Sequence, residues 1–98
     1  MLFMASAILL LDEKQVLADG AIVQMRLWQV PSPVRGSRHF IKYSLFYGRP
    51  GVRLLAYDNE AGKGDHVHRG EIETPYCFVS VEKLIADFLK EVRAMRGS

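Results

Sequence analysis

The sequence predicts an α+β domain in which an antiparallel β-sheet is packed by one C-terminal α-helix. Three observations predict this class: a helical hydrophobic period near the C-terminus, strand-like alternation through the middle of the chain, and glycine- or proline-rich turns between the strand-like runs. The 98 residues are enough for one domain with one modest core. We therefore expect residues 1–98 to form a single domain with a meander topology.

The first strands are predicted around a tight turn. Asp19 and Gly20 lie between two β-rich runs in KQVLADGAIVQMRLWQV, which favours a β-hairpin at this dipeptide. The preceding run MLFMASAILLL lacks the basic start and the cleavage site of a signal peptide, and it is too short to cross a bilayer. We interpret it as a buried strand. As an edge strand, it would instead offer a surface for a homodimer or another partner.

The middle of the chain predicts two more strands. Pro31 and Pro33 end the hairpin, and residues 34–39 are expected to form a loop. The run HFIKYSLFY then alternates between two faces: Phe40, Lys42, Ser44 and Phe46 on one, Ile41, Tyr43, Leu45 and Tyr47 on the other. A turn at residues 48–51 leads to the strand-like run VRLLAYDN.

The last element is an amphipathic helix over about residues 81–96. Its apolar residues follow the three-four spacing of one helical face: Val81, Leu84, Ile85, Phe88, Leu89, Val92 and Met95. Ser80 is a suitable N-cap, and Glu82 and Arg93 have the charges that favour the two ends of a helix.

Composition excludes disorder and indicates a basic middle. Apolar residues make up 49% of the chain and charged residues 24%, which is typical of a globular protein. Between residues 26 and 69 there are eight Lys or Arg against three Asp or Glu, so a polyanion-binding face and ordinary solvated strand edges are both open readings. The single Cys77 cannot form an internal disulfide, and we interpret it as a small core residue of a cytoplasmic protein. No membrane segment is predicted.

Residues 57–76, YDNEAGKGDHVHRGEIETPY, form the most polar segment and contain the candidate site. His66 and His68 are two residues apart, so in an extended chain both imidazoles project from the same face. Lys63 lies between two glycines, but the surrounding sequence lacks the spacing and the Ser or Thr of a phosphate-binding P-loop. A solvated polar turn is the alternative to a catalytic or metal-binding role.

Two chemistries suit the paired histidines. As an acid–base pair, His66 and His68 would remove the proton from a ribose 2′-hydroxyl and protonate the leaving 5′-oxygen, without a cofactor. Lys63 would stabilise the charged transition state, and Asp58 or Asp65 would orient an imidazole. The predicted substrate contacts are Arg26, Arg38, Lys42, Tyr57 and Asn59. As the alternative, His66 and His68 would bind a divalent metal ion together with Asp65 or Asp58.

The chain resembles the TumE family of small bacterial toxins. The resemblance covers about 90 residues and is carried by YDN-x-x-GKGDH-x-H, which stands here as YDNEAGKGDHVH, and by LADGAIVQMRLWQVPSPVRGSRHFIKY. It implies a cytoplasmic toxin of a type II toxin–antitoxin module, paired with a helix-turn-helix antitoxin. By analogy with other toxins of this size, we expect an endoribonuclease, a hydrolase that binds RNA. The alternatives are a metal-dependent nuclease or nucleotidyl-transferring toxin, and a non-enzymatic protein that inhibits a cellular target by binding.

Overall fold

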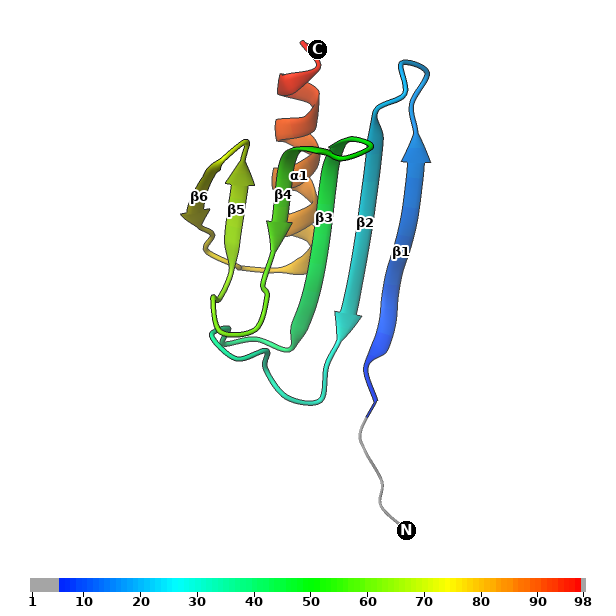
Figure 1. Ribbon diagram of the computed structural model, residues 1–98. Coiled ribbons are helices and arrows are strands. Elements are labelled where there is room, and N and C mark those ends of the chain that lie inside the picture. Colours follow the sequence, from blue (N-terminus) through cyan, green and yellow to red (C-terminus); the bar gives the residue numbers. More distant parts are fainter. Residues whose placement is uncertain (1–5, 98) are drawn as a thin grey trace.

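A computed structural model describes residues 6–97 and shows a six-stranded antiparallel sheet with one C-terminal helix (Figure 1). Every strand pairs with its neighbour in the chain, so the sheet is a meander and the predicted α+β class is confirmed. The elements are β1 (Ile8–Val16), β2 (Ile22–Gln29), β3 (Ile41–Arg49), β4 (Val52–Asp58), β5 (His66–Arg69), β6 (Ile72–Pro75) and α1 (Val81–Met95).

The two faces of the sheet differ as the alternation in β3 predicts. Tyr43, Leu45 and Tyr47 are buried in the core, whereas Lys42 and Ser44 are exposed. Helix α1 lies against the buried face (Figure 1). The opposite face, here called the open face, is defined by residues in register with Lys42 and Ser44: Gln24, Arg26, Trp28, Lys42, Ser44, Phe46, Ala56, Asp58, His66 and His68.

Helix α1 completes the core with an apolar stripe. Leu84, Phe88 and Val92 are buried, and the Phe88 ring packs edge-on against Tyr57 with 5.8 Å between centroids. The Ser80 hydroxyl accepts a hydrogen bond from the backbone N–H of Lys83 at 3.1 Å, which satisfies one of the free N–H groups at the start of the helix.

Replacing Phe88 with alanine is expected to lower the free energy of unfolding by about 3–5 kcal/mol, because it leaves a cavity between α1 and the sheet. Met95→Ala is the control, since Met95 is 46% exposed on the same helix, and it should cost less than about 1 kcal/mol. Urea unfolding followed by circular dichroism measures both. A loss for Phe88→Ala as small as the control's would contradict this packing.

Two burial predictions are wrong. Ile8, Leu9 and Leu10 are 59%, 53% and 47% exposed, because β1 is an edge strand and, among the described strands, pairs with β2 alone. Residues 1–5 of the same apolar run lie outside the described part of the chain. Cys77 is also exposed, because it lies in the connection between β6 and α1 rather than in a strand. Apolar composition alone did not reveal the position of either segment in the fold.

Candidate functional site

The candidate site begins where β4 and β5 pair. Asp58 lies directly opposite His66, and His68 follows two residues later on the same face. The His66 and His68 rings meet nearly at right angles, with 4.7 Å between centroids. One ligand atom from each of Asp58, His66 and His68 lies within 4.8 Å of the other two. These three residues are called the histidine cluster below.

The contact between Asp58 and His66 has an unusual geometry. His66 Nδ1 is 2.9 Å from the carbonyl oxygen of Gly64, which can only accept, so Nδ1 carries the ring proton of neutral His66. Nε2 then has a free lone pair and lies 2.6 Å from Asp58 Oδ1. Asp58 Oδ1 is buried and has no hydrogen-bond partner among the described residues. The two atoms are therefore close together without the geometry of a hydrogen bond. Two electron-pair donors therefore face one another.

The surroundings of His68 favour its neutral form. Burial lowers the pKa of its imidazole, and the positive charge of Arg53 lowers it further. Asp58 and Glu73 oppose the shift, and His68 Nδ1 is 3.7 Å from a Glu73 carboxylate oxygen, beyond hydrogen-bond distance. A neutral imidazole can accept a proton or donate its lone pair to a metal ion.

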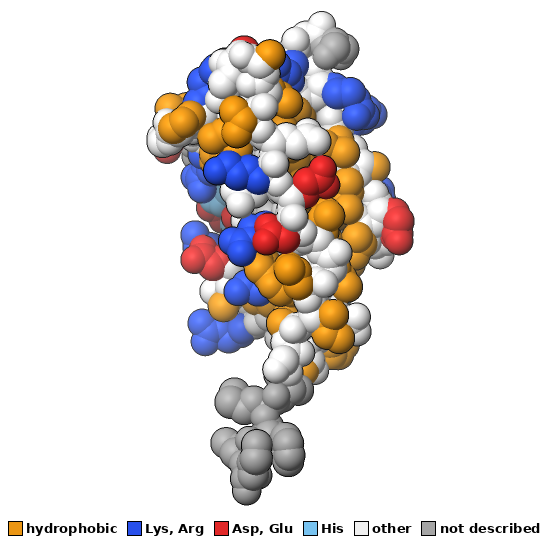
Figure 2. All heavy atoms as spheres, turned by 90° about the vertical axis from the view of Figure 1, so that its right-hand side faces the viewer, with side chains coloured by type: hydrophobic (Ala, Val, Ile, Leu, Met, Phe, Trp, Pro, Cys, Tyr) orange, Lys and Arg blue, Asp and Glu red, His pale blue; other side chains and the backbone are white. Residues whose placement is uncertain are grey.

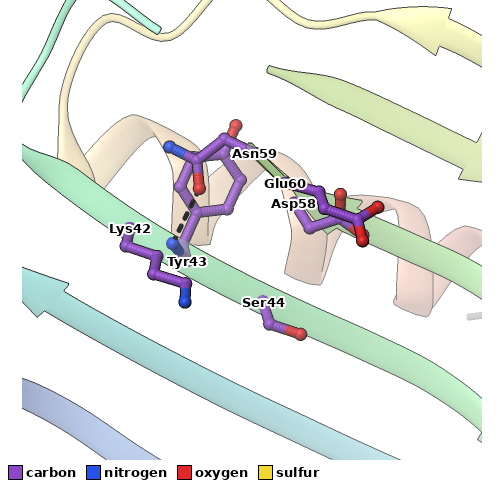
Figure 3. Close-up of a pocket in the computed structure, with 6 residues that line it drawn as sticks. All are labelled: Lys42, Tyr43, Ser44, Asp58, Asn59 and Glu60. Carbon is purple, nitrogen blue, oxygen red and sulfur yellow. Dashed lines mark hydrogen bonds between the residues drawn. The ribbon is translucent and has the colours of Figure 1, made fainter. Parts of the chain in front are cut away.

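Two shallow pockets flank the histidine cluster. Asp58 lines the first, shown in Figure 3 together with Lys42 and Ser44 of β3 and with α1 behind the sheet; its lining residues are Lys42, Tyr43, Ser44, Asp58, Asn59 and Glu60. His66 lines the second, with Lys63 and Glu73 nearby. The Lys63 ammonium is 3.9 Å from a Glu73 carboxylate oxygen and is largely exposed. Lys63 thus lines the same pocket as His66, and its electrostatic role stays a prediction.

Asp65 does not join the cluster, which corrects the prediction that it orients His66 or His68 or binds a metal ion with them. Its carboxylate accepts hydrogen bonds from Ser37 Oγ at 2.6 Å and from the Tyr43 hydroxyl at 2.7 Å, and it lies 2.7 Å from His39 Nε2. The His39 Nδ1 atom accepts from the Ile41 N–H, so Nε2 is the donor to Asp65. The pKa of Tyr43 is raised, first by burial and then by the hydrogen bond from its hydroxyl to Asp65.

The Asp65 contacts fasten together two loops at one end of the sheet. Ser37 and His39 belong to the β2–β3 loop, and Asp65 to the β4–β5 loop. The N–H of Gly62 also donates to the Arg35 carbonyl oxygen at 2.7 Å. A Cβ atom on Gly36 would lie 2.7 Å from the backbone nitrogen of Gly64, so only glycine at position 36 permits this approach. The loops in turn hold Gly64, whose carbonyl fixes the His66 ring.

Two predicted substrate contacts have packing or loop-holding positions instead. Tyr57 is 2% exposed and packs against Phe88 on the core face. Asn59 is buried and accepts a hydrogen bond from the Tyr43 N–H at 3.0 Å (Figure 3). It also donates to the Ile41 carbonyl oxygen at 2.7 Å. We therefore do not propose either side chain as a substrate contact.

The other predicted contacts divide between two places. Arg26 and Lys42 lie on the open face and flank Trp28, with 5.2 and 5.7 Å from their charged groups to the ring centroid. Arg38 lies in the β2–β3 loop and lines a different pocket with Phe78. In Figure 2, which views the β1 edge, basic side chains gather on the open-face side and apolar side chains along the edge.

The strand register connects Trp28 and its two cations to the histidine cluster. Arg26 pairs with Ser44, Ser44 with Asp58, and Asp58 with His66, which forms one row across four strands. Three inter-strand spacings give about 14 Å along this row. Trp28 and Lys42 form the adjacent pair on the same face. The strand register therefore places the aromatic and basic residues on the same face of the sheet as the cluster, in which His66 and His68 are buried and Asp58 is half-buried.

Sequence reasoning missed the residues that surround Asp65 and the cluster. Ser37, Tyr43 and Glu73 carried no signal for these contacts, because the partners of Asp65 are 22–28 residues away and Glu73 approaches only through the β5–β6 hairpin. Trp28 had a signal, its alternation with Arg26 on the predicted hairpin strand, but an aromatic residue in such a strand is more often part of the core.

Comparison with known families agrees with the resemblance seen in the sequence. A family model described as Toxin TumE matches residues 6–96, nearly the whole chain. The chain belongs to the TumE toxin family. The matched residues of this TumE toxin include the histidine cluster, the Asp65 contacts and the basic residues beside Trp28. No curated protein and no solved structure matches the chain. Within the described residues, no helix combines the length and apolarity needed to cross a membrane.

Proposed function

We propose that this TumE toxin cleaves RNA at the histidine cluster while single-stranded RNA lies across the open face. The observation that carries the proposal is the set of side chains on this face. Trp28, with the cations of Arg26 and Lys42 near its ring, shares it with Asp58, His66 and His68. Aromatic side chains stack on unpaired bases and basic side chains bind phosphates, so the face has both elements of a single-strand binding site.

The histidine cluster offers groups suited to the reaction. In cleavage by internal attack, the 2′-hydroxyl loses a proton, its oxygen bonds to phosphorus, and the departing 5′-oxygen gains a proton. Neutral His68 is suited to accept the first proton, and Lys63 to offset the charge that develops on the phosphoryl oxygens. A protonated His66 beside Asp58 would supply the second proton and be left neutral, or His66 and Asp58 would instead act with His68 as metal ligands. The choice between these two uses does not alter where the RNA binds.

The biological setting is proposed on the family alone. A toxin family suggests an antitoxin partner, and we propose a bacterial type II module in the cytoplasm with a helix-turn-helix antitoxin. The homodimer stays a prediction. The exposed apolar residues of the edge strand β1 are compatible with pairing to a copy or to the antitoxin.

Replacing Trp28 with alanine is expected to weaken binding of a single-stranded RNA oligonucleotide by about 1–3 kcal/mol, the usual contribution of one stacked base. Fluorescence anisotropy with a labelled oligonucleotide measures the affinity at fixed salt. Val79→Ala is the control, because Val79 is an exposed apolar residue in the connection to α1, outside the open face. Equal affinities of wild type and Trp28→Ala would contradict binding on the open face.

A further inference from the structure

The histidine cluster contains electron-pair donors without enough protons to pair them. His66 donates its Nδ1 proton to Gly64 O, so its Nε2 lone pair faces Asp58 Oδ1 at 2.6 Å. Oδ1 is buried and accepts no hydrogen bond within the described residues. A buried carboxylate oxygen without a partner is costly, since it has lost its hydration. A positive charge close to both His66 Nε2 and Asp58 Oδ1 would compensate this cost.

A proton alone fits this gap poorly. An imidazolium would satisfy Asp58 if its Nε2 proton pointed at Oδ1, but the contact lacks hydrogen-bond geometry despite its short distance. A metal ion makes no such demand, because it sits at the meeting point of lone pairs rather than on the line between two atoms. The third donor, a ring nitrogen of His68, lies within 4.8 Å of the other two.

We propose that Asp58, His66 and His68 bind one divalent transition-metal ion of the zinc class. Two imidazoles and one carboxylate are a donor set that such ions favour, and three protein ligands leave a coordination position open. Ligands about 2.0–2.1 Å from a tetrahedral ion lie about 3.3 Å apart. The 2.6 Å separation of His66 Nε2 from Asp58 Oδ1 would therefore lengthen on binding, and side chains of the cluster, whose ligand atoms all lie within 4.8 Å of one another, would adjust around the ion. The inference rests on the proposed function for the use of the ion, but not for its binding.

The surroundings of the ligands support the assignment. A metal-bound histidine usually donates its second ring N–H to a carbonyl or carboxylate, which fixes the ring and raises its basicity. His66 has this arrangement with the Gly64 carbonyl oxygen, and Glu73 lies 3.7 Å from His68 Nδ1. The fastened loops hold Gly64 in place. An ion here would act on RNA as a Lewis acid toward a phosphodiester oxygen.

The test is direct metal binding by the full chain, with any affinity tag removed and metal stripped by EDTA. Titration with Zn²⁺ in a calorimeter, and with Co²⁺ by visible absorption, should each give one ion per chain. His66→Gln, His68→Gln and Asp58→Asn should each weaken binding at least tenfold. Asp12→Asn is the control, because Asp12 is an exposed aspartate on β1 that lies outside the cluster and outside the loop contacts that hold Gly64. Its binding should be unchanged.

Two results would overturn the metal site: no stoichiometric binding by folded wild type, or equal binding by wild type and all three cluster variants. Circular dichroism checks that each variant is folded. If a variant does not fold, the Co²⁺ spectrum of wild type decides whether the metal site exists. RNA cleavage on the same samples separates this inference from the proposed function. Cleavage by a protein that shows no stoichiometric ion binding in the titrations overturns the metal site alone, whereas stoichiometric binding without cleavage overturns the proposed function alone.

Discussion

Growth arrest by this TumE toxin is expected to disappear when His66 and His68 are both replaced with glutamine. Glutamine keeps approximate size and polarity but can neither carry a proton at neutral pH nor replace an imidazole as a strong metal ligand. Loss of an acid–base group alone usually lowers a rate by about 10²–10⁴-fold. The double variant should therefore lose at least about 100-fold in activity, whichever way the imidazoles are used.

The measurement is growth after induced expression, with the protein level checked by immunoblotting. The control is Lys83→Gln, on the outside of α1, where the exposed ammonium pairs with Asp87 four residues later. This variant should arrest growth like wild type. Full arrest by the double variant, at equal protein level, would instead support a toxin that inhibits its target by binding alone.

Replacing Asp65 with alanine is expected to produce the largest stability loss of any loop substitution, about 3–5 kcal/mol. The carboxylate is only 10% exposed and has three side-chain partners at 2.6–2.7 Å. Removing it leaves the Tyr43 hydroxyl, Ser37 Oγ and the His39 ring N–H without their acceptor. The two fastened loops should separate, and His66 should lose its fixed orientation.

Equilibrium urea unfolding measures the Asp65 effect. The matched control is Asp12→Ala, since Asp12 is an exposed aspartate on β1 whose nearest cation, Arg26, is 3.5 Å away. An exposed pair of this kind contributes less than about 1 kcal/mol. If the Asp65 variant unfolds within 1 kcal/mol of wild type, the loop fastening has no energetic importance, and another interaction must hold Gly64 and His66.

The fold was predictable wherever a local period reports the environment of a residue. The alternation of Tyr43, Leu45 and Tyr47 and the three-four spacing of Leu84 and Phe88 were enough to assign β3 and α1 to the core. The order of strands across the sheet is not a local property. For this reason the apolar composition of the Ile8–Leu10 run predicts a strand, which β1 confirms, but not its exposure at the edge of the sheet.

The candidate site was predictable only in part. The His-x-His spacing placed both imidazoles on one face of an extended chain, and β5 is extended. The partner of His66 depends on the β4–β5 register, which selects Asp58 over Asp65 although Asp65 is adjacent in sequence. Asp65 is the nearer residue along the chain, but its side chain contacts Ser37, His39 and Tyr43 because two distant loops meet there.

The central claim is that the histidine cluster cleaves RNA. The most direct test is incubation of purified protein with total RNA, beside the His66/His68 double glutamine variant, in the presence of zinc and in the presence of EDTA. The account predicts RNA fragments with wild type in zinc, far fewer after EDTA treatment, and none with the double variant. Intact RNA in every wild-type reaction, or equal cleavage by the variant, would contradict it.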